Sequence, residues 1–391
     1  MARSLSGEVA IVGVGETPVG KVPGKSALWF HAEATRVALR DAGLDKSQVD
    51  GLLTGTSFVA PFHRMSVAVS EYLGIQPTFS NTLEVSGATA AASVSLAAAA
   101  IHSGLAEVVV VCCGDNMLSG MTRDRAVQAL VSSRDPQYEA PFGLLVPTTF
   151  ALTAQRHMHE YGTTPEQLAR VAVTMREHAR RTPGAQMTAP ITVADVLASK
   201  MITTPYHVLD CSLVSDGGVA FVLTSAERAR DFRTQPVYVL GAGESYTQEH
   251  IFCAESLTTT GARISSERAY RMAGLGPADM DVAGIYDCFT GTVVTMVEDL
   301  GFCDKGEGGP FVAAGEITFG GRIPTNTHGG LLSYAHPGIP GGFFHIAEVV
   351  RQLRGEAHGR QVAGARLGLV HSLGGGFATN ATIILGTERN G

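Results

Sequence analysis

The feature that most constrains the fold of this chain is an internal repeat. The segment Val37-Ala38-Leu39-Arg40-Asp41-Ala42-Gly43-Leu44 recurs as Arg268-Ala269-Tyr270-Arg271-Met272-Ala273-Gly274-Leu275. Each copy follows a glycine-containing apolar strand, which is typical of a duplicated structural unit. The alternative is two unrelated helices that share a common C-terminal glycine. We favour the repeat, because six residues match at one constant offset of 231: Ala38, Arg40, Ala42, Gly43, Leu44 and Asp50 correspond to Ala269, Arg271, Ala273, Gly274, Leu275 and Asp281.

The repeat predicts two similar α/β halves, at about 1–235 and 236–391. A chain of 391 residues is too long for one ordinary hydrophobic core, and 45% hydrophobic with 17% charged residues is typical of a well-packed globular enzyme. The first half contains a longer excursion at about 118–205, rich in Arg, Pro, Thr and His, with a predicted helix at 168–180. We expect this insertion to cover the active site or to contribute to a subunit interface.

Charge and hydropathy exclude several classes of protein. The net charge is −7, which does not indicate a nucleic-acid-binding surface. The N-terminal segment lacks the apolar core of a signal peptide, and no segment reaches the ~18 apolar residues of a membrane span. We therefore expect a cytoplasmic protein that binds neither nucleic acid nor membrane. The six cysteines form no CxxC pair, so we expect no metal site, and Cys112 and Cys113 are predicted to be buried strand residues.

Two glycine-rich segments near the C-terminus carry the strongest functional signal. One runs from Gly329 through Ala335-His336-Pro337 to Gly338, and the other is His371-Ser372-Leu373-Gly374-Gly375-Gly376. Together with the duplication, they resemble the last two active-site loops of the thiolase superfamily, and within it the sterol-carrier-protein type. The resemblance covers nearly the whole chain. It implies an α/β fold in which two halves form the duplicated thiolase fold, a five-layered αβαβα sandwich.

The same resemblance indicates that both catalytic cysteines of a thiolase are replaced here. The nucleophile position corresponds to Gly87, before a predicted helix at 88–103, and the second cysteine corresponds to Ser372. Ser86 is interpreted as the N-cap of that helix, with a serine nucleophile as the alternative. His336 corresponds to the histidine of the family's Gly-His-Pro turn and is a candidate catalytic residue. We expect six residues to line the bound substrate: Ser86, Gly87, His328, Ser372, Gly374 and Gly375.

A third loop points to a subgroup of the family. The family's Asn-Glu-Ala-Phe loop is replaced by Tyr286-Asp287-Cys288-Phe289, and the chain also reads Asn-Thr-His-Gly-Gly at 326–330. Both features, together with the missing cysteines, are similar to the thiolase-like aldolases that shorten steroid side chains. The best-known members of that subgroup replace the Gly-His-Pro histidine by a second tyrosine, whereas this chain keeps His336.

Without a cysteine nucleophile, ping-pong acyl transfer is lost, but an acyl-CoA site that stabilises an enolate remains. We therefore predict an aldolase that cleaves a β-hydroxyacyl-CoA, with a steroid side-chain thioester as the substrate that the resemblance implies. Tyr286 is predicted to be the base or proton shuttle, with a pKa lowered from ~10. His336 would hydrogen-bond the thioester oxygen or act as the acid. Asp287 would orient Tyr286 or serve as a cap. His345 is interpreted as structural, and a structural role is also the alternative to substrate binding for His328.

Two other functions stay open. The first is an acyl-CoA acyltransferase or condensing enzyme that uses Ser86 or direct transfer between bound substrates. The second is a non-catalytic acyl-CoA or lipid carrier or scaffold. The resemblance further implies a homodimer and a small OB-fold, zinc-ribbon-type partner protein. It implies no cofactor, since CoA enters as part of the substrate.

Overall fold

A computed structural model of the chain describes residues 5–131 and 134–389. Residues 1–4, in the segment predicted to lack a signal peptide, residues 132–133 of the predicted insertion, and residues 390–391 lie outside the described residues. The strands are β1 Val9–Glu16, β2 Gly51–Gly55, β3 Phe79–Leu83, β4 Val108–Asn116, β5 Met201–Thr203, β6 Tyr206–His207, β7 Asp216–Ser225, β8 Val237–Tyr246, β9 Val282–Ile285, β10 Leu367–Gly374 and β11 Thr379–Gly386. The α-helices are α1 Ala27–Ala42, α2 Met65–Leu73, α3 Thr89–His102, α4 Met117–Gly120, α5 Arg123–Val131, α6 Val146–Tyr161, α7 Pro165–Ala179, α8 Val193–Ala198, α9 Ala262–Ala273, α10 Thr290–Asp299, α11 Gly308–Ala313, α12 Gly330–Ser333 and α13 Gly341–Arg354.

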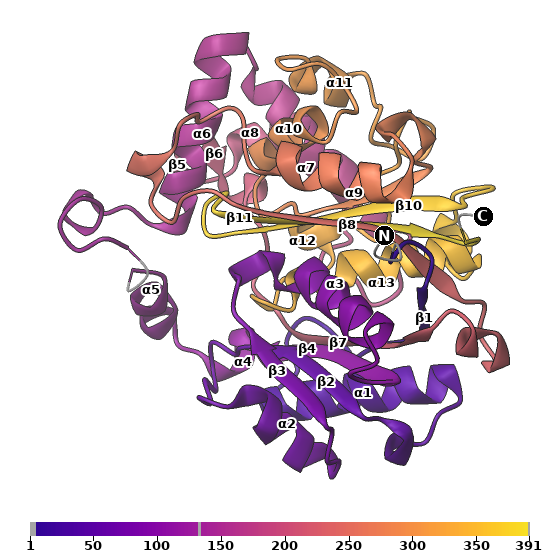
Figure 1. Cartoon of the computed structure of the whole chain (residues 1–391). Coiled ribbons are helices and arrows are strands. Elements are labelled where there is room, and N and C mark those ends of the chain that lie inside the picture. The colour runs from indigo at the N-terminus through magenta and orange to yellow at the C-terminus, as the bar shows by residue number, and fades with distance from the viewer. Residues whose placement is uncertain (1–4, 132–133, 390–391) are drawn as a thin grey trace.

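Nine strands form one hydrogen-bonded sheet that folds into two layers. Its order is β3-β2-β4-β7-β1-β8-β11-β10-β9. The two halves of the sheet are joined where β1 pairs with β8, at Ala10 with Tyr238 and Ile11 with Val237. Helices α3 and α13 lie between the two layers, while α1 and α2 cover one outer face and α9 and α10 the other (Figure 1). This is the predicted five-layered αβαβα sandwich.

The strand order also shows that the two halves repeat one topology. In the first half the order β1-β7-β4-β2 places each strand where β8-β11-β10-β9 places its counterpart in the second half. The first half adds β3, parallel to β2, and an isolated parallel bridge between Ala283 and Thr325 stands in the equivalent place beside β9. The repeat therefore exists in three dimensions as well as in sequence.

The matched residues of the repeat have the same structural roles in both halves. Gly43 ends α1 and Gly274 ends α9, each in the left-handed backbone region, with φ of 74° and 66°. The carboxylate of Asp50 accepts the backbone N–H groups of Glu107 and Val108 at the start of β4. The carboxylate of Asp281 likewise accepts the N–H groups of residues 366 and 367 at the start of β10. These aspartates align neighbouring parallel strands, which explains why they recur at the same offset.

The insertion lies over the second half of the molecule. The predicted helix at 168–180 corresponds to α7, which begins three residues earlier because Thr164 and Gln167 form a capping box before Pro165. Both α6 and α7 pack against α10, and α7 also contacts α11 and α12 (Figure 1). The insertion thus covers the outer layer next to the loop that contains His336.

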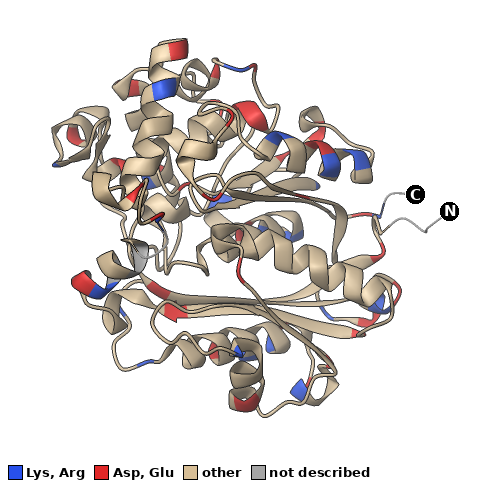
Figure 2. Cartoon of the chain, turned by 60° about the vertical axis from the view of Figure 1, so that its left-hand side comes forward, with Lys and Arg blue, Asp and Glu red and all other residues tan. Residues whose placement is uncertain are grey.

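The apolar and charged residues are distributed as a layered core requires. Cys112 and Cys113 are buried in β4, as predicted. Charged residues of both signs lie mainly on outer helices and loops, whereas the sheets and central helices carry few of them (Figure 2). Across the part of the chain that the structure describes, no helix combines the length and the apolar character needed to cross a membrane.

Candidate active site

Gly87 lies at the beginning of α3, where the backbone packs closely against two other segments. The turn Ser86–Ala88 connects β3 to α3. An ideal Cβ built at residue 87 would stand 2.2 Å from the carbonyl oxygen of Leu373 and 2.6 Å from Cζ of Tyr286. Gly374 approaches the same turn, since a Cβ on it would stand 2.5 Å from Cβ of Ser86. Predicted residues from three loops therefore meet at this helix end.

The interpretation of Ser86 as an N-cap is wrong. Its φ is 53°, its side chain accepts no capping bond, and its backbone N–H donates to Oε1 of Glu84 at 3.3 Å. The helix instead begins through a 3₁₀ turn, in which the hydroxyl of Thr89 accepts the backbone N–H of Val85. The close approach of Gly374 to Ser86 requires this tighter entry, and α3 therefore starts one residue later than predicted.

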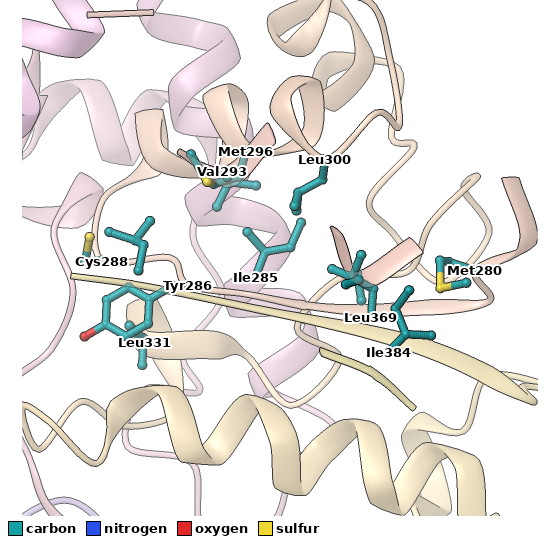
Figure 3. Packing of buried hydrophobic residues seen from close by; sticks show 14 of the residues in the cluster. Met280, Ile285, Tyr286, Cys288, Val293, Met296, Leu300, Leu331, Leu369 and Ile384 are labelled. Carbon is teal, nitrogen blue, oxygen red and sulfur yellow. The ribbon is translucent and has the colours of Figure 1, made fainter. Parts of the chain in front are cut away.

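Tyr286 is held at the end of β9 with its ring inside the protein. Its backbone N–H donates to the carbonyl oxygen of His371 at 3.1 Å, and its residue surface is 6% exposed. In Figure 3 the ring lies at one end of the buried apolar cluster, and its hydroxyl points away from the labelled apolar side chains. Strand β9 and its neighbour β10 therefore fix the direction of the hydroxyl.

The hydroxyl of Tyr286 reaches His336, and His336 in turn reaches a serine that the sequence analysis missed. Tyr286 Oη lies 3.1 Å from Nε2 of His336. Nδ1 of His336 lies 2.8 Å from Oγ of Ser212, on the segment between the insertion and β7. The backbone N–H of His336 donates to Oγ of Ser215. No local motif marks Ser212, because its contact to His336 spans 124 residues.

Burial keeps both members of the Tyr286–His336 pair neutral. Burial raises the pKa of Tyr286 well above its usual value, with further contributions from Cys288 and Asp287. This is opposite to the predicted lowering of the Tyr286 pKa, because burial and both neighbouring groups act in the same direction. Burial also lowers the pKa of His336 to about 4, although the negative charge of Asp287 opposes that shift. The hydroxyl therefore donates to Nε2, which leaves the remaining proton of His336 on Nδ1, facing Ser212.

Asp287 connects the loop of Tyr286 to the loop of His336. Its carboxylate accepts the backbone N–H groups of Leu331 at 2.8 Å and Leu332 at 3.4 Å, at the start of α12. A Cβ at residue 330 would stand 2.0 Å from Oδ2 of Asp287, so Gly330 leaves room for the carboxylate. Asp287 thus acts as a cap for α12, one of the two roles that the sequence left open.

His345 and His328 form a second buried layer behind Tyr286. The ring of His345 packs edge-on against Tyr286, at 6.2 Å between centroids, and its Nε2 is 3.4 Å from Oδ1 of Asp287. His328 packs against His345 and Tyr334 and is buried. Burial, together with His345, lowers the pKa of His328 well below its usual value. The substrate-binding role of His328 stays a prediction, and its ring does not lie beside the Tyr286–His336 pair.

The remaining predicted residues lie on β10 and the turn after it. Ser372 is fully buried, and its Oγ would be 3.3 Å from a Cβ placed on Gly342, which itself packs against Gly87. Gly375 lies farther along the turn, with φ of 60°. The glycine-rich segment therefore brings Ser372 and Gly374 to the site, while Gly375 shapes the turn into β11.

The cysteine that follows Asp287 in the loop after β9 is Cys288. Cys288 is buried beside Thr292, and desolvation raises its pKa. Among residues 5–131 and 134–389, no group of three or more His, Cys, Asp or Glu side chains is arranged to hold a metal ion. Two cavities, of about 550 and 400 Å³, lie along α7 and beside α9, and Tyr286 lines neither of them.

Comparison with protein families gives matches along most of the chain. Residues 9–205 match the family model described as "Thiolase, N-terminal domain", and residues 243–387 match "Thiolase C-terminal domain-like". The gap between the two matches includes β7 and the start of β8.

Three curated relatives and one solved structure are similar over nearly their whole lengths. The "Steroid side-chain-cleaving aldolase" of Thermomonospora curvata is 38% identical, over 98% of this chain and 99% of the relative. The "17-hydroxy-3-oxo-4-pregnene-20-carboxyl-CoA lyase" of Mycobacterium tuberculosis is also 38% identical, over 97% and 100%. An "Acetyl-CoA acetyltransferase" of Methanothermobacter thermautotrophicus is 35% identical, over 96% and 99%. A solved "Ltp2-ChsH2(DUF35) aldolase" superimposes with a TM-score of 0.87 at 37% identity, over 98% of both chains.

Proposed function

Because this chain belongs to the thiolase family, we propose that it is a carbon–carbon lyase of that family. It cleaves a β-hydroxyacyl-CoA by a retro-aldol reaction, and its substrate is the CoA thioester of a steroid side chain. The products are a ketone or aldehyde and a shorter acyl-CoA. The observation that carries this proposal is the 3.1 Å contact between Tyr286 Oη and His336 Nε2 beside Gly87. The aldolase and lyase relatives, at 38% identity over nearly the whole chain, support it.

The first chemical step is removal of a proton from the substrate hydroxyl. The β-hydroxyl donates its proton to Oη of Tyr286, while Tyr286 passes its own proton to Nε2 of His336. A tyrosine with a raised pKa cannot act as a preformed phenolate, but it can relay a proton in this way. His336, with its lowered pKa, is neutral near pH 7 and can accept the proton. Tyr286 is thus a proton shuttle and His336 the base.

The second step breaks the Cα–Cβ bond. The electron pair of that bond moves to the thioester, which becomes an enolate, and the Cβ–O bond becomes a carbonyl. The proton held on His336 then returns through Tyr286 to Cα, so the acyl-CoA product forms without net change in the enzyme. Asp287, whose negative charge favours the protonated form of His336, stabilises the site while His336 holds the extra proton. We assign Asp287 as a positioning residue.

Tyr286→Phe tests the relay directly. The variant keeps the ring and removes only the hydroxyl, so cleavage should fall by ~10²–10⁴-fold while CoA-ester binding and folding persist. The assay supplies a panel of β-hydroxyacyl-CoA thioesters, including steroid side-chain thioesters, and follows the carbonyl product and the released acyl-CoA by mass spectrometry.

Tyr270→Phe is the matched control. Tyr270 is also a buried tyrosine, but its hydroxyl donates to the carbonyl oxygen of Leu300, on the other side of the second half. That variant should keep wild-type cleavage with a modest loss of stability. Full activity of Tyr286→Phe would remove Tyr286 from the reaction.

An acyltransferase is the second candidate function, because the acetyltransferase relative is 35% identical over 96% of this chain. Such an enzyme would form a covalent acyl-enzyme at Ser86 or transfer the acyl group directly. Intact-protein mass spectrometry after incubation with acetyl-CoA separates these outcomes. A stable acyl adduct that Ser86→Ala abolishes would favour the acyltransferase over the lyase.

We also propose that the protein acts as a homodimer together with a DUF35-type partner. Strand β3 is one of the two edge strands of the nine-stranded sheet and could pair with the same strand of a second copy. The name of the solved aldolase joins Ltp2 to ChsH2(DUF35), which supports the second partnership. Light scattering of the purified protein, with and without a co-expressed DUF35 protein, tests both.

A further inference from the structure

We propose that Gly87 determines which type of reaction this site catalyses. Because residue 87 has no side chain, the hydroxyl of Tyr286 can occupy the position that faces His336. The inference deepens the proposed function and rests on it. It states that a reactive group on α3 and a reactive tyrosine after β9 exclude each other. The site is therefore restricted to substrates that carry a hydroxyl for Tyr286 to deprotonate, and acyl thioesters without that hydroxyl are not turned over.

The exclusion follows from the distances around residue 87. A Cβ there would stand 2.6 Å from Cζ and 2.7 Å from Oη of Tyr286, closer than real Cβ contacts come. The ring has little freedom to withdraw. Its backbone is held by the hydrogen bond to His371, its ring packs against His345, and its hydroxyl is hydrogen-bonded to His336.

The position of the hydroxyl explains why this exclusion selects the chemistry. Oη of Tyr286 is 2.7 Å from the place of a Cβ on residue 87 and 3.1 Å from Nε2 of His336. A reactive atom attached to that Cβ and directed at His336 would need the same space. His336 can therefore have either a reactive group from α3 or the phenol of Tyr286 as its hydrogen-bond partner, but not both.

The test must separate Tyr286 from a second neighbour of Gly87. The same Cβ would also stand 2.2 Å from the carbonyl oxygen of Leu373, a backbone contact that does not depend on the tyrosine. Gly87→Ala can therefore destabilise the protein for two reasons. A double-mutant cycle isolates the part that arises from Tyr286.

The first measurement is thermal unfolding of Gly87→Ala in the wild-type and Tyr286→Ala backgrounds. We expect Gly87→Ala to lower the unfolding temperature less in the Tyr286→Ala background, because the ring no longer occupies the space of the new methyl group. If Gly87→Ala alone does not fold but the double variant does, that outcome supports the proposal in the same way. An equal loss in both backgrounds, or failure of both to fold, would overturn the proposal, because Leu373 alone would then require the glycine. This measurement needs no activity, so it stands even if the proposed cleavage is not observed.

The second measurement is the rate of cleavage. Gly87→Ala should lower kcat by ~100-fold or more, because the displaced hydroxyl no longer relays a proton. In the Tyr286→Phe background the same change should cause no further loss, since the relay is already absent. Losses that multiply would show that Gly87 acts independently of Tyr286 and would contradict the inference. Gly359→Ala is the control. A Cβ added there would have no atom within 4 Å, so this variant replaces a glycine without crowding a neighbour.

Discussion

At the residue scale, the site consists of a phenol, an imidazole and a serine hydroxyl in one line of hydrogen bonds. Tyr286 donates to His336, and His336 donates through Nδ1 to Ser212. Each partner fixes the proton position of the next, so Nε2 of His336 is left as the acceptor. The arrangement is neutral at rest, and charge appears only when a substrate proton arrives.

Ser212→Ala should weaken catalysis without removing it. The hydrogen bond between neutral groups contributes about 1 kcal/mol to the correct tautomer and ring position of His336, so kcat/KM should fall about 5-fold. Because the serine acts on the protonation of His336, the acid midpoint of the pH–rate profile should also move. Ser215→Ala, which loses a contact to the backbone of His336 and one to the side chain of Gln186 but none to the imidazole, should leave that midpoint in place. An unmoved midpoint in Ser212→Ala would assign the serine to packing alone.

The pH–rate profile should have an acid limb near pH 4. His336 must be neutral to accept a proton, and burial lowers its pKa from 6.5 to about 4. The base is therefore available at pH values above about 4, and kcat/KM should fall only as the pH drops through that value. The measurement is kcat/KM from pH 4 to 8 in the range where the protein stays folded. Since kcat/KM reports the ionisations of the free enzyme, a midpoint near 6.5 would mean that His336 is not the base.

The residues of this site could be predicted from the sequence better than their protonation states. Gly87, Tyr286 and His336 each stand in a recognisable loop, and the structure brings all three together. Ser212 has no motif, because only the folded chain brings it to His336. The direction of the Tyr286 pKa shift was predicted wrongly, since it depends on the desolvation of the ring and not on the residue type.

At the element scale, α7 of the insertion supports the loop of His336. Arg176 is 4% exposed, and its guanidinium donates to Oγ of Ser333 at 3.0 Å and to the carbonyl oxygen of Ala189 at 2.9 Å. Ser333 ends α12, three residues before His336. The insertion therefore supports the active site from behind through one buried side chain.

Arg176→Ala should destabilise the protein by about 2–3 kcal/mol, since it removes two hydrogen bonds made by a charged donor. Cleavage should also fall, because α12 loses its contact to α7. Arg180→Ala, at the C-cap of the same helix, is the matched control: this arginine is exposed and pairs with Glu177, so the change should stay within about 0.5 kcal/mol. Urea unfolding and kcat of both variants give the comparison. Equal effects would contradict the supporting role of Arg176.

The elements whose ends are easiest to predict from the sequence are helices with a capping residue at each end. Helix α1 is such a helix, because Ser26 caps its N-terminus and Gly43 its C-terminus. Strand β9 has only four residues, and its place beside β10 depends on pairing with a strand 85 residues later. Such long-range pairing leaves little trace in local sequence, so it was not predicted.

At the scale of the whole molecule, the site lies where the two halves meet. Gly87 belongs to the first half, and Tyr286 and His336 to the second. The halves are also joined by Arg354 of α13, which donates to Asp41 of α1 and to the carbonyl oxygen of Gln235. The geometry of the site therefore depends on the packing of both halves.

Stability should fall as the pH drops below about 6.5. Burial lowers the pKa values of five histidines: His31, His178 and His336 to about 4, His371 to about 3, and His328 to well below 6.5. Below pH 6.5 the unfolded chain binds protons that the folded chain does not, so each histidine lowers the stability by about 1.4 kcal/mol per pH unit until its folded pKa is reached. Burial raises the pKa of Asp115 to about 6. Below that pH its carboxyl binds a proton in the folded state, which offsets the loss of stability from one histidine.

Urea unfolding between pH 7.5 and 5 measures this slope. His63→Gln, at an exposed histidine, should not change it. The outcome that contradicts the expectation is constant stability across this range, which would mean that the buried histidines exchange protons equally well in both states.

The single sheet that runs through β1 and β8 sets the timescale on which the site can open. Separating the halves would break that pairing and the Arg354 bonds together, which is a step of global unfolding and therefore rare. Entry and exit of a large thioester must instead use loop motions, on the nanosecond to microsecond scale. In hydrogen exchange, the amides of β1, β8 and α3 should therefore exchange slowly and at similar rates, because they open together. Amides of the segments through which the substrate enters should exchange much faster.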